Sequence, residues 1–332
     1  MLLLPYRSYG TATRLYLVGR VLADEPLPAP ADRESVWRGL RLMWQRIETD
    51  EVPGAEIEVS FGPQTARVTT DDEGYFRLHL TPAAPLPWND GWHPVPLRLV
   101  GLPRGFRLST DQENAIVATA TVLVPPPDAE FGIISDIDDT IVETGATSLP
   151  RMFRNTFLRH YRERLPFAGV AEFYRALQLG RNGKRNNPVF YVSSSPWNLY
   201  DLLDDFMRFH GLPAGPILLR DFGLRARNLR EGHLDHKLRE ISQVFDTYPA
   251  LPFVLIGDSG QRDPQIYREI VRRYPGRVRA IYIRDVDAAR TGTRRNAVVT
   301  GYAAEIAATV PMLLVPDSAA AMAHAAELGL IT

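Results

Sequence analysis

The sequence F-G-I-I-S-D-I-D-D-T, residues 131–140, joins a short apolar run directly to an acidic cluster. Three carboxylates fall within positions 136–139, and their mutual repulsion requires a cation or a proton among them. A solvated acidic turn does not ordinarily follow a buried strand. A calcium loop of the EF-hand type that began at Asp136 would need glycine and glutamate where Ile141 and Thr147 stand. The stretch therefore predicts a buried strand that presents an acidic site at its carboxyl end.

Similar apolar runs recur along the rest of the chain, and amphipathic stretches with helical spacing separate them. The runs are F-G-I-I-S, V-F-Y-V-S, P-I-L-L, F-V-L-I-G, V-R-A-I-Y-I and P-M-L-L-V. Continuous apolar runs are typical of strands buried on both faces, and their interleaving with helices indicates an α/β fold with a doubly wound parallel, Rossmann-like sheet. Ligands of such sheets bind beyond the carboxyl ends of the strands, so the chemistry is expected there.

The first part of the chain, residues 13–124, has a different periodicity. Segments such as A-E-I-E-V-S-F and Y-F-R-L-H-L tend to alternate apolar and polar residues, and turn formers such as Pro53-Gly54 separate them. This pattern predicts an antiparallel β-sandwich. Within it, T-D-D-E-G-Y-F-R-L resembles the turn-plus-strand unit of transthyretin-like and carboxypeptidase-regulatory-like sandwiches. One helix is expected at residues 33–48, where apolar residues recur at helical spacing.

A proline run separates these two patterns. The chain has 332 residues, which exceeds the size typical of one domain. Pro125-Pro126-Pro127 cannot continue a sheet or enter a helix interior. We therefore predict a β-rich amino-terminal domain over residues 1–127 and an α/β domain over residues 128–332.

The composition excludes several classes of function. Hydrophobic residues make up 45% and charged residues 23% of the chain, which is ordinary for a globular protein and argues against disorder. A net charge of −1 without a domain-wide basic bias gives no support for a nucleic-acid partner. The absence of cysteine excludes disulfides, thiolate metal sites and cysteine nucleophiles. Neither a glycine-rich dinucleotide motif nor a Walker motif occurs, so nucleotide cofactors have no support.

No stretch of the sequence predicts export or membrane insertion. The amino-terminal run M-L-L-L is too short for a signal-peptide core, and about 18 consecutive uncharged apolar residues occur nowhere. We therefore expect a cytoplasmic protein whose contact with a membrane would be peripheral. The sequence favours no particular oligomeric state.

The D-x-D-D-T stretch resembles motif I of the haloacid dehalogenase superfamily of phosphotransferases, and the other motifs of that superfamily have counterparts in the required order. Ser193 ends V-F-Y-V-S, where motif II has a hydroxyl after a strand. Lys237 lies in a helix start, D-H-K-L-R-E, suitable for motif III. Asp258 and Asp263 lie in I-G-D-S-G-Q-R-D, which resembles motif IV. The resemblance implies the haloacid dehalogenase type of fold and phosphatase chemistry.

Three longer segments resemble a narrower family, the actin-patch-protein type of phosphatidate phosphatase, which is a relative of the lipin catalytic domain. The segments are D-I-D-D-T-I, Y-V-S-S-S-P-W-N-L-Y and G-D-S-G-Q-R-D-P-Q-I-Y. The resemblance covers about residues 131–315. It implies hydrolysis of phosphatidate to diacylglycerol and phosphate.

Phosphate-ester chemistry gives the acidic residues distinct expected roles. A magnesium ion bound by Asp136 and Asp258 would neutralise phosphoryl charge and help to hold the nucleophile in line. Asp136 then attacks phosphorus to form an aspartyl-phosphate, while Asp138 protonates the leaving alkoxide and later activates water. By the resemblance, the backbone carbonyl of Asp138 is a further magnesium ligand. Asp263 is expected to orient metal-bound water, and its alternative role is to cap the helix that begins at Pro264.

Ser193 and Lys237 are expected to contact the phosphate, the first as a hydrogen-bond donor and the second as a countercharge. Ser193 could instead be a helix N-cap, and the two serines that follow it are rivals for either role. Lys237 could instead be an exposed helix residue paired with Glu240 or Asp235.

Two basic stretches bear on the choice of substrate. Residues 148–164 predict a helix with an aromatic side and many arginines, which could lie at a lipid interface or cap the site and bind a phosphate head group. Its alternative is a helix packed on the sheet with its arginines in water. Residues 220–230 could also line the pocket.

Three functions remain open from the sequence. The first is a magnesium-dependent phosphatidate phosphatase that works at a membrane surface. The second is the same chemistry on a soluble phosphate monoester, and the third is a lipid-sensing module that binds phosphatidate without turnover. The presence of both Asp136 and Asp138 favours turnover. The β-rich part could recruit partners, contact a membrane or cover an edge of the catalytic domain.

Overall fold

The computed structural model describes residues 1–23, 51–106, 116–141, 166–184, 186–220, 233–286 and 293–332. The helices predicted at residues 33–48 and 148–164 lie outside these residues, as does nearly all of the basic stretch 220–230. Contacts between residues divide the chain into two compact units, Met1–Val124 and Pro125–Thr332. Among the described residues, no helix has both the length and the apolar character that crossing a bilayer would require.

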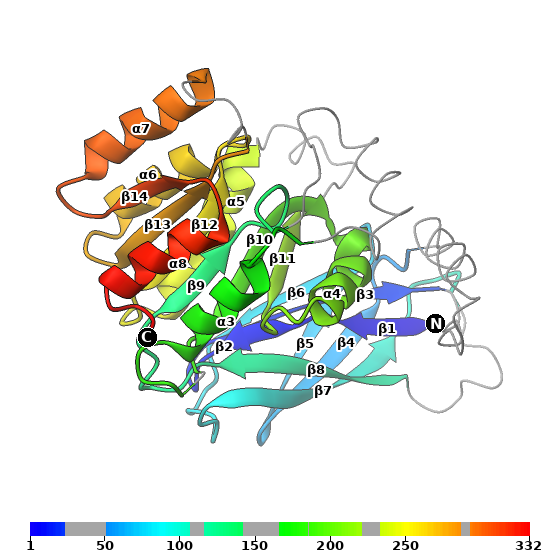
Figure 1. Ribbon diagram of the computed structural model, residues 1–332. Coiled ribbons are helices and arrows are strands. Elements are labelled where there is room, and N and C mark those ends of the chain that lie inside the picture. The colour runs from blue at the N-terminus through cyan, green and yellow to red at the C-terminus, as the bar shows by residue number, and fades with distance from the viewer. Residues whose placement is uncertain (24–50, 107–115, 142–165, 185, 221–232, 287–292) are drawn as a thin grey trace. The chain divides into compact units, whose positions relative to one another are not determined.

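The described residues of the first unit form one hydrogen-bonded sheet of eight strands (Figure 1). The strands are β1 (Leu2–Pro5), β2 (Ser8–Gly10), β3 (Leu15–Leu22), β4 (Glu56–Phe61), β5 (Gln64–Thr69), β6 (Tyr75–Leu80), β7 (Gly91–Gly101) and β8 (Val117–Val124). Their order is β1-β3-β2-β8-β7-β4-β5, and β6 pairs with β3. Among the described strands every pairing is antiparallel except that of β2 with β8. The prediction of an antiparallel β-rich first half is confirmed, and the transthyretin-like resemblance stays a prediction.

Alternation of side chains builds the core of this sheet. In β4, Ile57, Val59 and Phe61 are buried, and the residues between them are more exposed, as a half-buried strand requires. These side chains join an apolar cluster with residues of the other strands. The turn before β6 is closed by the Asp71 carboxylate, which accepts the main-chain N–H groups of Glu73 and Tyr75 at 3.0 Å each.

The second unit contains a six-stranded sheet, all of whose described pairings are parallel, and this confirms the predicted α/β class (Figure 1). Its strands are β9 (Gly132–Ser135), β10 (Val189–Pro196), β11 (Ile217–Arg220), β12 (Phe253–Asp258), β13 (Val278–Arg284) and β14 (Met312–Val315). Its helices are α3 (Val170–Leu179), η3 (Trp197–Leu199), α4 (Tyr200–Phe209), α5 (His233–Thr247), α6 (Asp263–Arg273), α7 (Arg294–Ile306) and α8 (Ser318–Glu327). All residues of β9 and β12 are buried, which explains their continuous apolar sequences.

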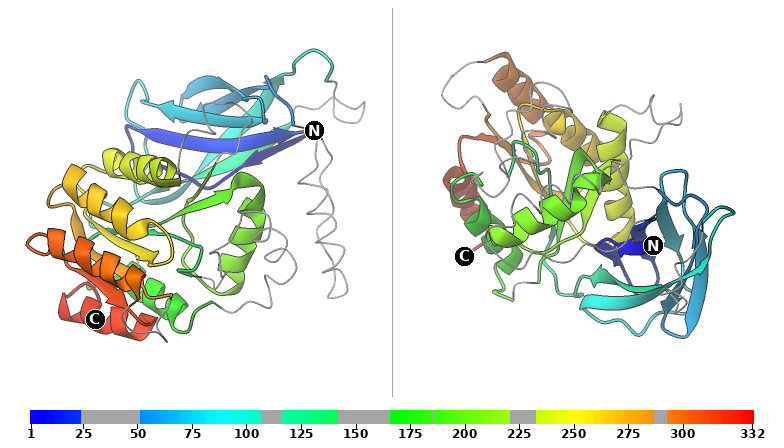
Figure 2. Two further views of the ribbon diagram at one scale, coloured as in Figure 1. Left: turned by 90° about the horizontal axis from the view of Figure 1, so that it is seen from above. Right: turned by 90° about the vertical axis from the view of Figure 1, so that its right-hand side faces the viewer.

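The strand order places a switch point beside β9. The order β11-β10-β9-β12-β13-β14 means that the chain moves one way from β9 to β11 and the other way from β12 to β14. Right-handed crossovers then put α3 and α4 on one face and α5, α6 and α7 on the other, and Figure 2 shows helices on both faces of this sheet. The chain therefore leaves the carboxyl ends of β9 and β12 toward opposite faces, and open α/β sheets bind ligands in the crevice that results.

Candidate active site

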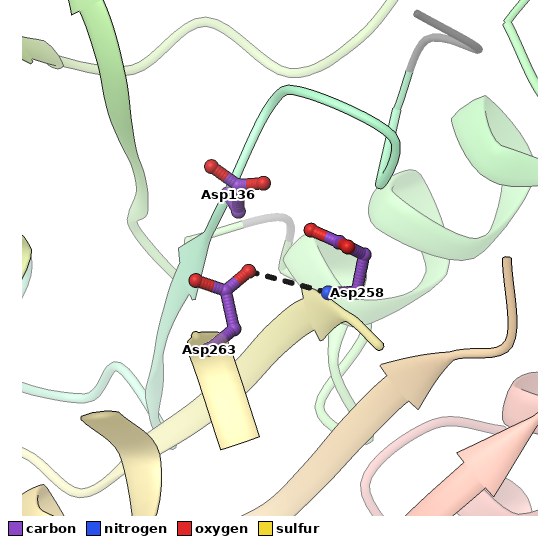
Figure 3. A group of neighbouring side chains, drawn as sticks. All are labelled: Asp136, Asp258 and Asp263. Carbon is purple, nitrogen blue, oxygen red and sulfur yellow. Dashed lines mark hydrogen bonds between the residues drawn. The ribbon is translucent and has the colours of Figure 1, made fainter. Parts of the chain in front are cut away.

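Three aspartates meet at this switch point. Asp136 directly follows β9, Asp258 ends the neighbouring parallel strand β12, and Asp263 begins α6. One carboxylate oxygen from each lies within 4.8 Å of the others, and Figure 3 shows the three side chains converging from their separate elements. All three are buried. The structure thus brings together residues that lie more than 100 positions apart in the sequence.

Lys237 supplies the positive charge in this cluster. It lies in the first half of α5, and its side chain is only 3% exposed. Its Nζ atom lies 2.7 Å from Asp136 Oδ1 and 2.7 Å from Asp263 Oδ1. Burial by itself would lower the pKa of Lys237, but the negative charges of Asp136 and Asp263 outweigh burial and raise it above its ordinary value. Lys237 is therefore a buried ammonium group that bridges two carboxylates, in contrast to the exposed helix residue that the sequence also allowed.

The loop after β12 holds Asp258 and Asp263 in place. The Asp258 Oδ1 atom accepts the main-chain N–H groups of Gly260 at 2.6 Å and Gln261 at 2.9 Å. The main-chain N–H of Asp258 donates to Asp263 Oδ2 at 3.2 Å. Gly257 makes this approach possible, because a Cβ atom there would lie 2.6 Å from both Cβ and Oδ2 of Asp263. The second oxygen of Asp258, Oδ2, is buried and has no hydrogen-bond partner among the described residues.

The three consecutive serines of β10 are separated by their orientation. Ser193 Oγ donates to Asp138 Oδ2 at 2.7 Å, and Ser195 Oγ donates to the same oxygen at 3.2 Å. Successive strand residues point to opposite faces, and Ser194 makes no contact with Asp138 among the described hydrogen bonds. Ser193 and Ser195 therefore both face the site. The other oxygen of Asp138, Oδ1, is buried, and no described residue forms a hydrogen bond with it.

Gln261 is a site residue to which the sequence assigned no role. Its Nε2 atom donates to Asp136 Oδ2 at 3.2 Å and to the main-chain carbonyl of Asp138 at 3.1 Å. The signal for it was present, because Gln261 falls within the D-S-G-Q segment that carries the narrower resemblance. Thr140 also lies near Asp136, with Oγ1 at 3.4 Å from Asp136 Oδ2.

The electrostatics of the cluster favour an added positive charge. Burial raises the pKa of Asp136 well above its ordinary value of 3.8; Lys237 opposes this shift, and Asp263, Asp138 and Asp258 reinforce it. Burial also raises the pKa of Asp258 well above that value, and the charge of Asp263 adds to the effect. With Asp139, the described residues place five buried carboxylates around one buried ammonium group, that of Lys237. A divalent cation with oxygen ligands would relieve this repulsion.

Residues 131–285 match the family described as "Phosphatidate phosphatase APP1, catalytic domain". The Phosphatidate phosphatase APP1 of Saccharomyces cerevisiae is 35% identical over 156 residues, which cover 46% of this chain and 26% of that protein. An uncharacterized protein of Schizosaccharomyces pombe is 32% identical over 181 residues, which cover 54% of this chain and 29% of that protein. The chain thus matches less than a third of the length of these curated relatives.

Among solved structures, a carbohydrate acetylesterase from Xanthomonas citri aligns with 91% of this chain and 72% of its own, at 12% identity and a TM-score of 0.27. So low a score carries no argument about fold or function. The family match covers β9 to β13 and contains every aspartate of the cluster together with Lys237, Ser193 and Gln261. Residues 131–285 therefore match the APP1 type of phosphatidate phosphatase catalytic domain, which confirms the resemblance to that family.

Proposed function

We propose that this protein is a magnesium-dependent phosphatidate phosphatase that forms an aspartyl-phosphate on Asp136 and yields diacylglycerol and phosphate. One observation carries the proposal: Asp136 directly follows the first parallel strand of a family-matched catalytic domain and lies beside Lys237, Asp258 and Asp263. Its substrate, a membrane lipid, would place the protein at a membrane surface, as a cytoplasmic protein in peripheral contact.

The donor set fits magnesium. Carboxylates of Asp136 and Asp258 and the main-chain carbonyl of Asp138 would hold it, and Asp263 would orient a bound water. The fit is supported by the unpartnered Asp258 Oδ2, because a buried carboxylate oxygen without a donor is otherwise costly. All of these ligands are oxygen atoms, which magnesium prefers over nitrogen or sulfur. When bound, the ion would neutralise charge on the phosphoryl oxygens.

The residues of the chain divide the reaction into two displacements. In the first, a carboxylate oxygen of Asp136 forms a bond to phosphorus, the bond from phosphorus to the glycerol oxygen breaks, and Asp138 gives that oxygen a proton. In the second, water attacks phosphorus, the bond to Asp136 breaks, and Asp138 takes back the proton. Lys237 offsets the negative charge of Asp136 and of the phosphoryl group, and Ser193 donates a hydrogen bond.

The surroundings of Asp138 suit the acid–base role. Burial raises its pKa above the ordinary value, although its hydrogen bond from Ser193 opposes the shift. A raised pKa favours the protonated form that donates to a leaving alkoxide. Its Oδ2 atom accepts hydrogen bonds from Ser193 and Ser195, and in the described part of the chain Oδ1 has no hydrogen-bond partner. Oδ1 is thus the oxygen available to exchange the proton.

The decisive experiment measures phosphate release from phosphatidate in detergent micelles with magnesium. We expect turnover by the wild-type protein and a loss of at least about a thousandfold for Asp136→Asn, because the amide cannot act as the nucleophile. Circular dichroism should show that the variant keeps its fold. Chelation of the cation should stop turnover by the wild-type protein, and readdition should restore it.

A panel of soluble phosphate monoesters, run beside the lipid, tests the choice of substrate. Faster release from a soluble ester than from phosphatidate would replace the lipid by that substrate class. Binding to phosphatidate vesicles without phosphate release from any ester would refute the enzyme and favour a sensor.

A further inference from the structure

The side-chain amide of Gln261 lies at the centre of the site but takes no part in the reaction steps above. Its Nε2 atom contacts Asp136 Oδ2 at 3.2 Å and the carbonyl oxygen of Asp138 at 3.1 Å. Ionised carboxylate and carbonyl oxygens can only accept hydrogen bonds, so the NH₂ end of the amide must face them. Gln261 thus presents two donors to two acceptors that come from different parts of one turn.

These two oxygens are also two of the ligands that the proposed function assigns to magnesium. A cation held by these two oxygens would have to lie close to both of them, and the amide hydrogens that point at them carry partial positive charge. Each oxygen has more than one lone pair, but a cation near both oxygens would be repelled by the amide hydrogens. The amide and the cation therefore compete for the two oxygens.

The rest of Gln261 does not have to move when the amide leaves. Its main-chain N–H donates to Asp258 Oδ1 at 2.9 Å, and this bond leaves Asp258 Oδ2 available. The side chain is part-exposed, in contrast to the buried aspartates. Rotation about its own torsions therefore releases both oxygens without a shift of the loop.

We propose that Gln261 is a positioning residue that competes with the divalent cation: its amide holds Asp136 and the Asp138 carbonyl in a ligand-like arrangement until the cation displaces it. The inference rests on the proposed magnesium site and deepens it. Two hydrogen bonds must be given up when the cation binds. Gln261 therefore weakens cation binding while keeping the acidic turn ordered without it.

The test is cation affinity measured without substrate, by isothermal titration calorimetry with magnesium and with manganese. Gln261→Met keeps the length of the side chain but cannot donate, so we expect it to bind the cation about three- to tenfold more tightly than the wild-type protein. Gln261→Leu repeats the change with a shorter side chain. Gln265→Met is the matched control, because Gln265 lies on the first turn of α6 and makes no hydrogen bond to the cluster among the described residues.

Thermal unfolding gives a second readout that does not depend on activity. Without cation, Gln261→Met should unfold at a lower temperature than the wild-type protein, and added magnesium should raise its Tm by more. Unchanged or weaker cation affinity in both Gln261 variants would overturn the inference, whereas wild-type turnover would still support the proposed function. Tight cation binding without phosphate release from any ester would overturn the proposed function but not the competition. If the wild-type protein bound neither cation at millimolar concentration, both would fall.

Discussion

The two units of this protein bury different kinds of side chain. In the described part of the first unit, the buried polar or charged residues are Ser8, Arg20 and Thr70, and the remaining interior is an apolar cluster. In the described part of the second unit, a group of aspartates and Lys237 is buried at the ends of two parallel strands. Arg20 donates to Glu51, which is 41% exposed, whereas Lys237 and its two partners are nearly inaccessible to water.

The difference shows where stability and function separate. A sheet with alternating apolar and polar residues buries its apolar side chains and leaves its charged side chains at the edge. There the charged groups stay hydrated, so each ion pair changes the stability little. A cluster of buried carboxylates is destabilising unless each member has a partner, so its presence is weak evidence for stability and better evidence for a site. Three pairs of matched variants can break or sharpen this contrast.

The largest effect is expected for Lys237→Met. Removal of the ammonium group leaves Asp136 and Asp263 buried without their charged partner, which typically costs about 3–5 kcal/mol. Phosphate release should also be lost. Arg20→Met is the counterpart in the first unit. It should lower the free energy of unfolding by less, because the part-exposed carboxylate of Glu51 can be hydrated when the arginine is removed. The free energy of unfolding of each variant is measured by urea unfolding, followed by hydrogen exchange in peptides from each unit. Equal losses of stability in the two variants would contradict the predicted difference between the two buried cations.

Two glycines provide a matched pair with a smaller effect on stability. A Cβ atom at Gly257 would lie 2.6 Å from the Asp263 carboxylate, and one at Gly19 would meet the ring of Phe76 and lie 2.6 Å from the carbonyl oxygen of Leu4. Either alanine variant should lose about 1–3 kcal/mol through crowding. Only Gly257→Ala should displace a carboxylate of the site.

Cation affinity and kcat/KM separate the two glycine variants. Both quantities should fall about tenfold or more in Gly257→Ala and stay within about twofold in Gly19→Ala. A loss of activity in Gly19→Ala as large as that in Gly257→Ala would show that the first unit supports the site, and the contrast would fail.

The smallest effect concerns the pH dependence of stability. Burial lowers the pKa of His236 to about 3, and the positive charges of Arg239, Arg220 and Lys237 act in the same direction. Below pH 6.5 the His236 side chain therefore binds a proton in the unfolded chain but not in the folded protein. The free energy of unfolding decreases as the pH falls from 6.5 toward 3. Between pH 7 and pH 5 this amounts to up to about 2 kcal/mol, at about 1.4 kcal/mol per pH unit.

His236→Asn should remove that part of the acid sensitivity, as measured by urea unfolding at pH 7 and pH 5. His79 in the first unit is the control: partial burial lowers its pKa too, and Arg77 adds to the shift, but the residue is exposed. His79→Asn should therefore change the acid sensitivity less. The same acid sensitivity in wild type and His236→Asn would show that His236 does not carry it.

Much of the site was predictable because parallel α/β sheets bring their strand ends together. An apolar run followed by an acidic turn marked Asp136, and the same reasoning marked Asp258 after a second run. The contact of Gln261 was not predictable, since it depends on the pairing of β9 with β12 and on one side-chain rotamer. The joint role of Ser193 and Ser195 was not predictable for a similar reason: only the structure shows which face of β10 meets Asp138.

The sequence by itself determined the change from alternating to continuous apolar runs, the order of the motifs and the residue types that suit phosphate chemistry. Those features depend on local periodicity and on covalent neighbours, which a linear pattern contains. Tertiary structure alone decided that Lys237 bridges Asp136 and Asp263, that Gly257 admits the Asp263 side chain, and that Gln261 contacts two expected metal ligands. Such contacts join strands and helices far apart in the chain, and their geometry is set by how the sheet and its helices pack.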